Sequence, residues 1–176
     1  MATGVAATVG GTFYETLALA AFALLGLWWV VVADRRREWS ALPHRRRQAY
    51  TVSLYFTLTG IMSLASLISE AHPAIWRLAF GISAGIGAAE IVLSLGYAHA
   101  EASRQRLVGG LLALTLPLYL VIVAVAIHPS LAPGVGIHLK PLETEAMAVS
   151  LVLFIGINYG WLLFMDPGRA PGEADQ

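Results

Sequence analysis

The feature that most constrains this chain is a series of five apolar segments, each about 20 residues long and nearly free of charge. An α-helix of that length crosses the roughly 30 Å hydrocarbon core of a bilayer. Helices in soluble cores are rarely so long and so apolar on every side. The segments are residues 13–33, 50–69, 74–98, 107–128 and 145–165. They predict an all-α membrane protein: a bundle of five transmembrane helices within one domain, residues 1–166, followed by a disordered tail, residues 167–176.

The scarcity of charge supports the same fold class. Charged residues make up only 12% of the 176 residues, whereas about 25% is usual in a soluble domain. So few charges cannot cover a surface that faces water, so the expected surroundings are a lipid bilayer. The first apolar segment has no basic residues before it, and a cleaved signal peptide would need them. We therefore expect this segment to be retained as a helix.

The basic residues are distributed unevenly between the predicted loops, and this sets the expected orientation. The first loop contains two arginine triplets, and arginine-rich loops stay in the cytoplasm. If this loop is cytoplasmic, nine of the eleven basic residues fall on the cytoplasmic side. The N-terminus is then outside and the C-terminus in the cytoplasm. The triplets are also expected to contact anionic lipid headgroups; their members are Arg35, Arg36, Arg37, Arg45, Arg46 and Arg47.

The residue with the clearest functional potential is Glu90, which lies near the middle of the third predicted helix. A carboxylate at that depth costs about 2.5–3.5 kcal/mol or more on insertion scales, so it should face protein or water rather than lipid. One interpretation is an ion-binding or proton-carrying group, because ionisable groups within a membrane are commonly functional. The other is a carboxyl group that is hydrogen-bonded across the bundle and serves packing alone.

Several other polar residues are expected at a depth similar to that of Glu90. They are Tyr55 and Thr57 on the second predicted helix, Thr115 on the fourth and Asn158 on the fifth. Pro117 removes one backbone hydrogen bond in the fourth helix and thereby releases a carbonyl group nearby. These groups are predicted to form a polar layer that lines an ion or proton path past Glu90.

Small residues recur at four-residue spacing along the third predicted helix. Gly81, Gly85 and Ala89 form one such series, with Gly87 close by. Small side chains at this spacing let helices approach closely in lipid. We expect this face to serve helix packing within the chain or contact between subunits.

Other kinds of chemistry have little support in the sequence. There are no cysteines, so disulfides, thiol catalysis and cysteine-based metal sites are excluded. No phosphate-binding or zinc-protease motif occurs. We therefore predict no metal site, no cofactor, no catalytic residue and no nucleic-acid partner, and an enzyme is the least favoured class.

Three functions remain, all of them in the cell membrane. The predominance of arginine over lysine favours a bacterial chain, and hence the bacterial inner membrane. The leading hypothesis is a small homo-oligomeric channel or pore that conducts cations or protons past Glu90. The first alternative is an interaction or regulatory subunit that needs a partner membrane protein. The second is a lipid-binding protein or membrane-embedded enzyme.

Overall fold

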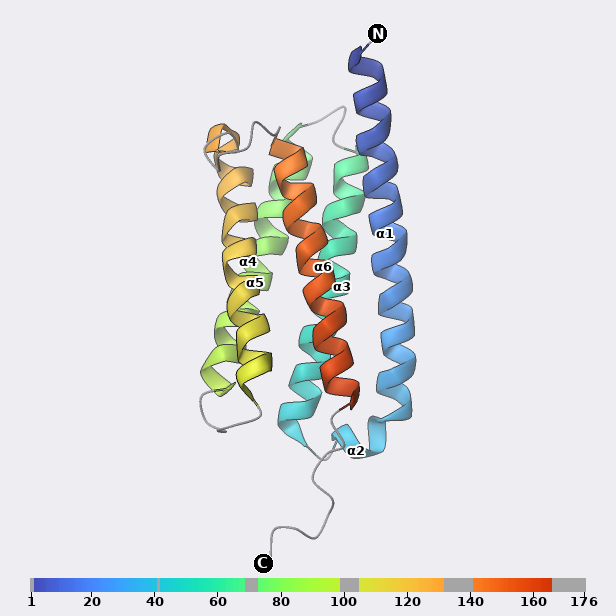
Figure 1. Cartoon of the computed structure of the whole chain (residues 1–176), viewed down its shortest axis with the longest axis vertical. Coiled ribbons are helices and arrows are strands. Elements are labelled where there is room, and N and C mark those ends of the chain that lie inside the picture. The colour runs from blue at the N-terminus through green and yellow to red at the C-terminus, as the bar shows by residue number, and fades with distance from the viewer. Residues whose placement is uncertain (1, 41, 69–72, 99–104, 132–140, 166–176) are drawn as a thin grey trace, which may run out of the picture.

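The computed structural model describes residues 2–40, 42–68, 73–98, 105–131 and 141–165, and they form a bundle of long helices (Figure 1). The helices are α1 (Ala2–Asp34), α2 (Arg36–Ser40), α3 (Pro43–Ile68), α4 (Pro73–Ala98), α5 (Gln105–Ile127) and α6 (Pro141–Met165). All except α2 contain a stretch long and apolar enough to cross a membrane. The five-helix architecture predicted from the sequence is therefore confirmed.

Three helices begin at least four residues before the predicted apolar segments: α1 begins at Ala2 rather than at residue 13, and α3 and α6 each begin at a proline. Helix α3 begins at Pro43 rather than near residue 50, and α6 begins at Pro141 rather than at Glu145. Proline is favoured in the first turn because its ring fixes φ and its missing N–H is not needed there. As a result Arg47 lies on α3 itself, and Glu145 lies one turn inside α6. The tail predicted for residues 167–176 falls outside the described residues.

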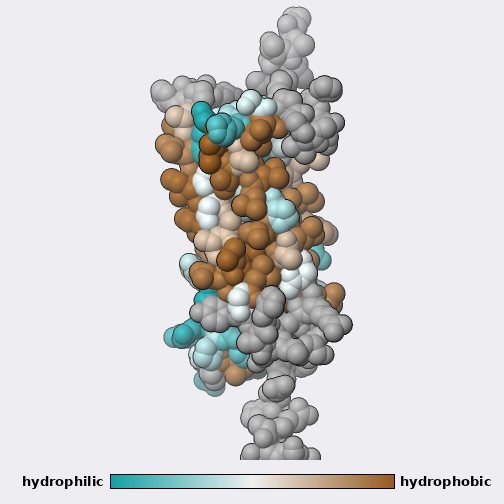
Figure 2. Space-filling view, turned by 90° about the vertical axis from the view of Figure 1, so that its left-hand side faces the viewer, coloured by the Kyte–Doolittle hydropathy of each residue, from teal (hydrophilic) through white to brown (hydrophobic). Residues whose placement is uncertain are grey.

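Helix α3 is the centre of the bundle. It packs against α1, α2, α4 and α6, while α4 also packs on α5 and α5 on α6. Of the apolar span of α3, 61% is buried, compared with 22% for α1, 28% for α4 and 33% for α5. Apolar side chains cover the middle of the face formed by α4 and α5, and hydrophilic residues gather toward its two ends (Figure 2). The outer helices thus face lipid, whereas α3 is mostly enclosed by protein.

Glycines on α6 and α4 allow bulky side chains from α3 and α5 to approach them closely. A Cβ atom at Gly156 would lie 2.7 Å from Cβ of Tyr55, and one at Gly87 would overlap the ring of Tyr119. Glycine at these two positions leaves room for two tyrosines that are almost completely buried. Small residues at crossing points are typical of helix packing in membranes.

Side chains of Trp28 and Arg77 join helices by hydrogen bonds near the two ends of the bundle. At one end the indole N–H of Trp28 on α1 donates to the carbonyl oxygen of Ala49 on α3, at 3.0 Å. At the other end the Arg77 guanidinium on α4 donates to the carbonyl oxygens of Ala126 and Ile127, at 2.8 and 2.6 Å. The arginine thereby satisfies carbonyl groups that the last turn of α5 leaves without an intrahelical partner.

The crossing of α3 and α6 provides a test of this packing. We expect Gly156→Ala to lower the free energy of unfolding by about 1–3 kcal/mol, because its methyl group would overlap Cβ of Tyr55 rather than a flexible side-chain end. Gly26→Ala on α1 is the matched control, since no atom lies within 4 Å of its added Cβ; its effect should stay below about 1 kcal/mol. Thermal unfolding in mild detergent measures both, and equal effects would contradict the predicted overlap.

Candidate functional site

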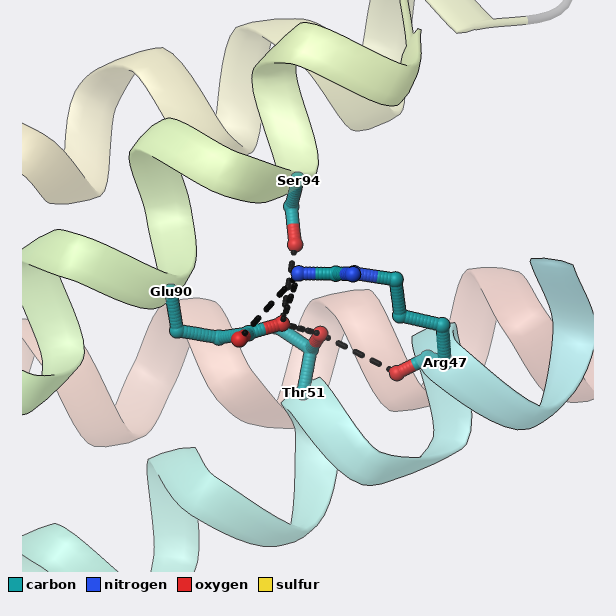
Figure 3. A network of polar contacts seen from close by, with 4 residues as sticks. All are labelled: Arg47, Thr51, Glu90 and Ser94. Atoms are coloured by element: carbon teal, nitrogen blue, oxygen red, sulfur yellow. Dashed lines mark hydrogen bonds and ion pairs between the residues drawn. The ribbon is translucent and has the colours of Figure 1, made fainter.

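An ion pair between α3 and α4 forms the core of the candidate site (Figure 3). It lies toward the end of the bundle at which α1 ends and α3 begins, which we call the basic end; the opposite end, where α6 begins, is the far end. Nη2 of Arg47 is 3.4 Å from each carboxylate oxygen of Glu90. The Glu90 side chain is 13% exposed and that of Arg47 is 33% exposed. The carboxylate is therefore largely withdrawn from the surface, while its cation keeps partial access to it.

Two hydroxyl groups complete the surroundings of this carboxylate. The Thr51 hydroxyl on α3 and the Ser94 hydroxyl on α4 each lie 3.1 Å from Oε1 of Glu90 and can donate to it. Thr51 Oγ1 also lies 3.1 Å from the carbonyl oxygen of Arg47, one turn earlier. A carboxylate with a cation and two hydroxyl donors is compensated enough to persist within a membrane protein. The four residues form a connected network (Figure 3).

A second polar contact lies deeper in the bundle, at the centre of the predicted polar layer. The Tyr55 hydroxyl on α3 is 2.8 Å from Oγ1 of Thr115 on α5. Thr115 donates its own proton to the carbonyl oxygen of Leu111, at 2.8 Å, so Tyr55 is the donor in the contact between them. The rings of Tyr119 and Tyr159 lie 6.5 and 6.3 Å from that of Tyr55. Three tyrosines therefore meet in the buried middle of the protein.

The structure does not bring every residue of the predicted path together. The side-chain amide of Asn158 donates to the carbonyl oxygen of Phe154 in its own helix, at 2.8 Å. Thr57 is half-buried and lies on the side of α3 opposite to Tyr55, because two residues turn a helix by about 200°. Of the predicted residues, Tyr55 and Thr115 are in direct contact, and Glu90 binds groups outside that set.

The arginine triplets also divide into different environments. Arg36, Arg37 and Arg46 are exposed, as expected for contact with headgroups. Arg35 pairs with Glu38 at 3.2 Å. Arg45 is buried, and Arg47 binds Glu90. All six arginines were predicted to lie in a loop at the membrane surface, whereas the second triplet lies on α3, where Arg45 is buried and Arg47 faces α4.

The small residues of α4 likewise face in different directions. Gly87 is buried against the Tyr119 ring and so serves packing within the chain. Gly85 and Ala89 are exposed, and no atom lies within 4 Å of a Cβ atom added at Gly85. Gly81 is half-buried, with Cβ of Ala126 at 3.9 Å from its added Cβ. Gly85 and Ala89 thus remain on the surface of the single chain.

A row of polar side chains at four-residue spacing is the feature that sequence analysis missed. We call it the polar stripe of α3. Its first five members, at four-residue spacing, are Arg47, Thr51, Tyr55, Thr59 and Ser63, and Ser66 follows three residues later. Residues four apart lie on nearly the same face of a helix. The five members from Thr51 onward are all buried, with relative exposures between 0% and 7%. The exact recurrence of Thr51, Tyr55, Thr59 and Ser63 was visible in the sequence and was the signal that could have revealed the stripe.

Two hydroxyl groups of the stripe have no hydrogen-bond partner within the described part of the chain. They are Oγ1 of Thr59 and Oγ of Ser63, both fully buried. Hydroxyl groups in helices commonly donate to the carbonyl oxygen four residues earlier, as Ser66 does to Met62 at 3.1 Å. A buried hydroxyl without a partner costs about 1–3 kcal/mol. Thr59 and Ser63 are therefore the two members of the stripe whose hydroxyl groups stay unsatisfied among the described residues.

Comparison with known proteins adds no identity to this site. No family model, curated protein or solved structure matches the chain. The function is therefore argued from the network around Glu90 and from the polar stripe.

The coupling between Arg47 and Glu90 can be measured with a double-mutant cycle. Arg47→Gln and Glu90→Gln should each lower the free energy of unfolding, and the double variant should lose less than the sum of the two. We expect a coupling of about 1 kcal/mol, because the pair is only partly buried. Arg46→Gln is the control, since Arg46 is exposed, and its effect should stay within about 0.5 kcal/mol. Strictly additive losses would show that the pair does not interact.

Proposed function

We propose that this protein conducts protons across the membrane along the polar stripe of α3, past Glu90. The observation that carries the proposal is the burial of the stripe, which runs through the most enclosed helix of the bundle. Thr51 and Ser66 are separated by about 22 Å along the helix axis, most of the roughly 30 Å of a hydrocarbon core. Burying a polar row of this length costs considerable free energy. A role in proton conduction would explain why the row is present.

The spacing of the stripe favours a water-assisted relay. Successive members rise by about 6 Å along α3, whereas one hydrogen bond between oxygens spans about 2.8 Å. One water molecule between neighbouring hydroxyl groups would bridge that distance. Protons can pass along such an alternation of hydroxyl and water.

Protons are also favoured over metal cations by the charge at the basic end. Arg47 lies beside Glu90, so a hydrated metal cation approaching there would meet a fixed positive charge. A proton can instead be accepted by the carboxylate, which neutralises Glu90 and weakens its hold on Arg47. In this scheme Glu90 accepts and releases protons. The positive charge of Arg47 favours the ionised carboxylate and so determines the free energy needed for each proton transfer.

The oligomeric state and orientation are part of the proposal. The exposed Gly85 and Ala89 on α4 offer a surface on which a second helix could approach closely, which supports a homo-oligomer of independent proton paths. The arginines at the basic end support a cytoplasmic location for that end. The N-terminus then lies outside, and the protein belongs to the plasma membrane, which in a bacterium is the inner membrane.

The relay can be tested by removing one hydroxyl group from the stripe. We expect Thr59→Val to reduce proton flux roughly tenfold, because loss of one hydrogen-bonding station raises the barrier by about 1–2 kcal/mol. Valine has nearly the same shape, and the Thr59 hydroxyl has no partner among the described residues, so the fold should be retained. A pH-sensitive dye inside proteoliposomes reports the flux under an imposed potential.

Thr57→Val is the matched control, since this threonine lies on the other side of the same helix and should leave flux unchanged. Glu90→Gln should abolish flux. If wild-type protein conducts no protons, or Thr59→Val conducts as well as wild type, the proposal fails. Absence of flux together with a co-purifying membrane protein would favour the interaction subunit, whose contact surface would be the exposed small residues of α4.

The proposed orientation predicts which end of the bundle can be labelled from outside the cell. The natural chain has no cysteine, so single cysteines can be introduced without background. Ser130 and Ser40 are both exposed, beyond the end of α5 and at the end of α2 respectively. A membrane-impermeant maleimide should label Ser130→Cys in intact cells and Ser40→Cys only after lysis. The reverse pattern would show the opposite orientation.

A further inference from the structure

A second carboxyl group, Glu145, lies near the far end of the bundle and has no role in the network described above. It is on α6, one turn from the first residue, and its relative exposure is 0%. Neither of its carboxyl oxygens has a hydrogen-bond partner within the residues that the structure covers. A buried carboxyl group that lacks a partner is expensive, so this position calls for a ligand that the described residues do not supply.

The surroundings of Glu145 contain oxygen atoms from two other helices. Tyr14 on α1 lies close to Glu145 and to Ser66 on α3. The Tyr14 hydroxyl donates its proton to the carbonyl oxygen of Leu142, at 2.7 Å, and Ser66 donates to that of Met62. Because these protons are committed elsewhere, both hydroxyl oxygens can act only as acceptors toward a ligand. The far ends of α1, α3 and α6 lie together at the top of Figure 1.

No positive side chain among those described compensates Glu145. The nearest candidate by position, Arg77 on α4, is bound to the carbonyl oxygens at the end of α5. The described charged or titratable groups toward the far end are Tyr14 and Glu15 on α1, Arg77 on α4, His128 after α5, and Glu143 on α6.

We propose that Glu145, Tyr14 and Ser66 form a binding site for one small monovalent cation, either a proton or a sodium-class metal ion. The donor set consists of oxygen atoms alone, which suits hard cations. One carboxylate with no compensating partner is neutralised by a single positive charge, whereas a divalent ion would leave a net positive charge buried.

The site adjoins Ser66, the last member of the polar stripe. Its role as the point where a cation is loaded from outside rests on the proposed function. The binding itself does not, because it follows from the burial, donor set and charge of the site alone.

Thermal unfolding of the full chain in detergent tests the binding without any flux assay. In one series NaCl replaces choline chloride at constant ionic strength, and in the other the pH is raised without sodium. A ligand that binds only the folded protein raises Tm with its concentration. If sodium binds, wild-type Tm should rise by roughly 3–5 °C per tenfold increase near saturation. If a proton binds, Tm should fall as the pH rises.

Glu145→Gln should remove whichever dependence the wild type shows, and Glu143→Gln, at an exposed position on the same helix, should retain it. Ser66→Ala keeps the carboxyl group but removes one oxygen ligand, so it should shift the midpoint of the dependence about threefold or more. It also provides a second comparison if Glu145→Gln does not fold. Sodium dependence identifies a metal ion as the ligand, and pH dependence alone identifies a proton.

The proposal is overturned if the Tm of Glu145→Gln depends on sodium and on pH in the same way as that of wild type, or if Ser66→Ala shifts neither midpoint. A cation-dependent Tm in a protein that conducts nothing would support this site and reject the proton path. The two proposals therefore fail by different results.

Discussion

The cost of placing polar groups in hydrocarbon governs the arrangement of this protein. Lipid offers no hydrogen bonds, so each polar side chain within the span must find protein or water. Helix α3 carries most of these side chains and accordingly occupies the centre, surrounded by α1, α4 and α6. The other four spans are apolar enough to face lipid and shield it. The bundle is therefore organised around its least hydrophobic member.

The number of hydrogen-bond partners that buried polar groups have changes along α3. Groups with partners can serve structure alone, whereas groups without partners invite a functional explanation. Near the basic end Glu90 has a cation and two hydroxyl groups as neighbours, and the network is connected. Farther along, Thr59 and Ser63 have no partner among the described residues, and the same holds for the Glu145 carboxyl. Buried groups without partners are unusual in native proteins. Thr59 and Ser63 belong to the proposed proton path, and Glu145 belongs to the proposed cation site.

The sequence predicted the features that depend on local composition. It did not predict the side-chain partners, which depend on contacts between helices. Five spans follow from the length and hydropathy of single segments, and the structure confirms them. Glu90 could be expected to face protein, but its partner could not be named, because Arg47 was placed in a loop. The extension of α3 back to Pro43 moved Arg47 onto the helix, one turn before Thr51. Glu145 was similarly placed at the start of a helix, and only the packing of α1 and α3 around α6 shows that it is buried.

The four-residue spacing of the stripe also has a rotational consequence. Because a helix turns by about 100° per residue, each step of four advances the stripe by roughly 40° around α3. From Thr51 to Ser63 the row therefore winds through about a third of a revolution, from the α4 side toward α1 and α6. This spiral explains how one helix can meet carboxyl groups on two different neighbours. A displacement of α3 by a single residue would swing every member away from its neighbours together, so the whole row would connect or disconnect as one unit.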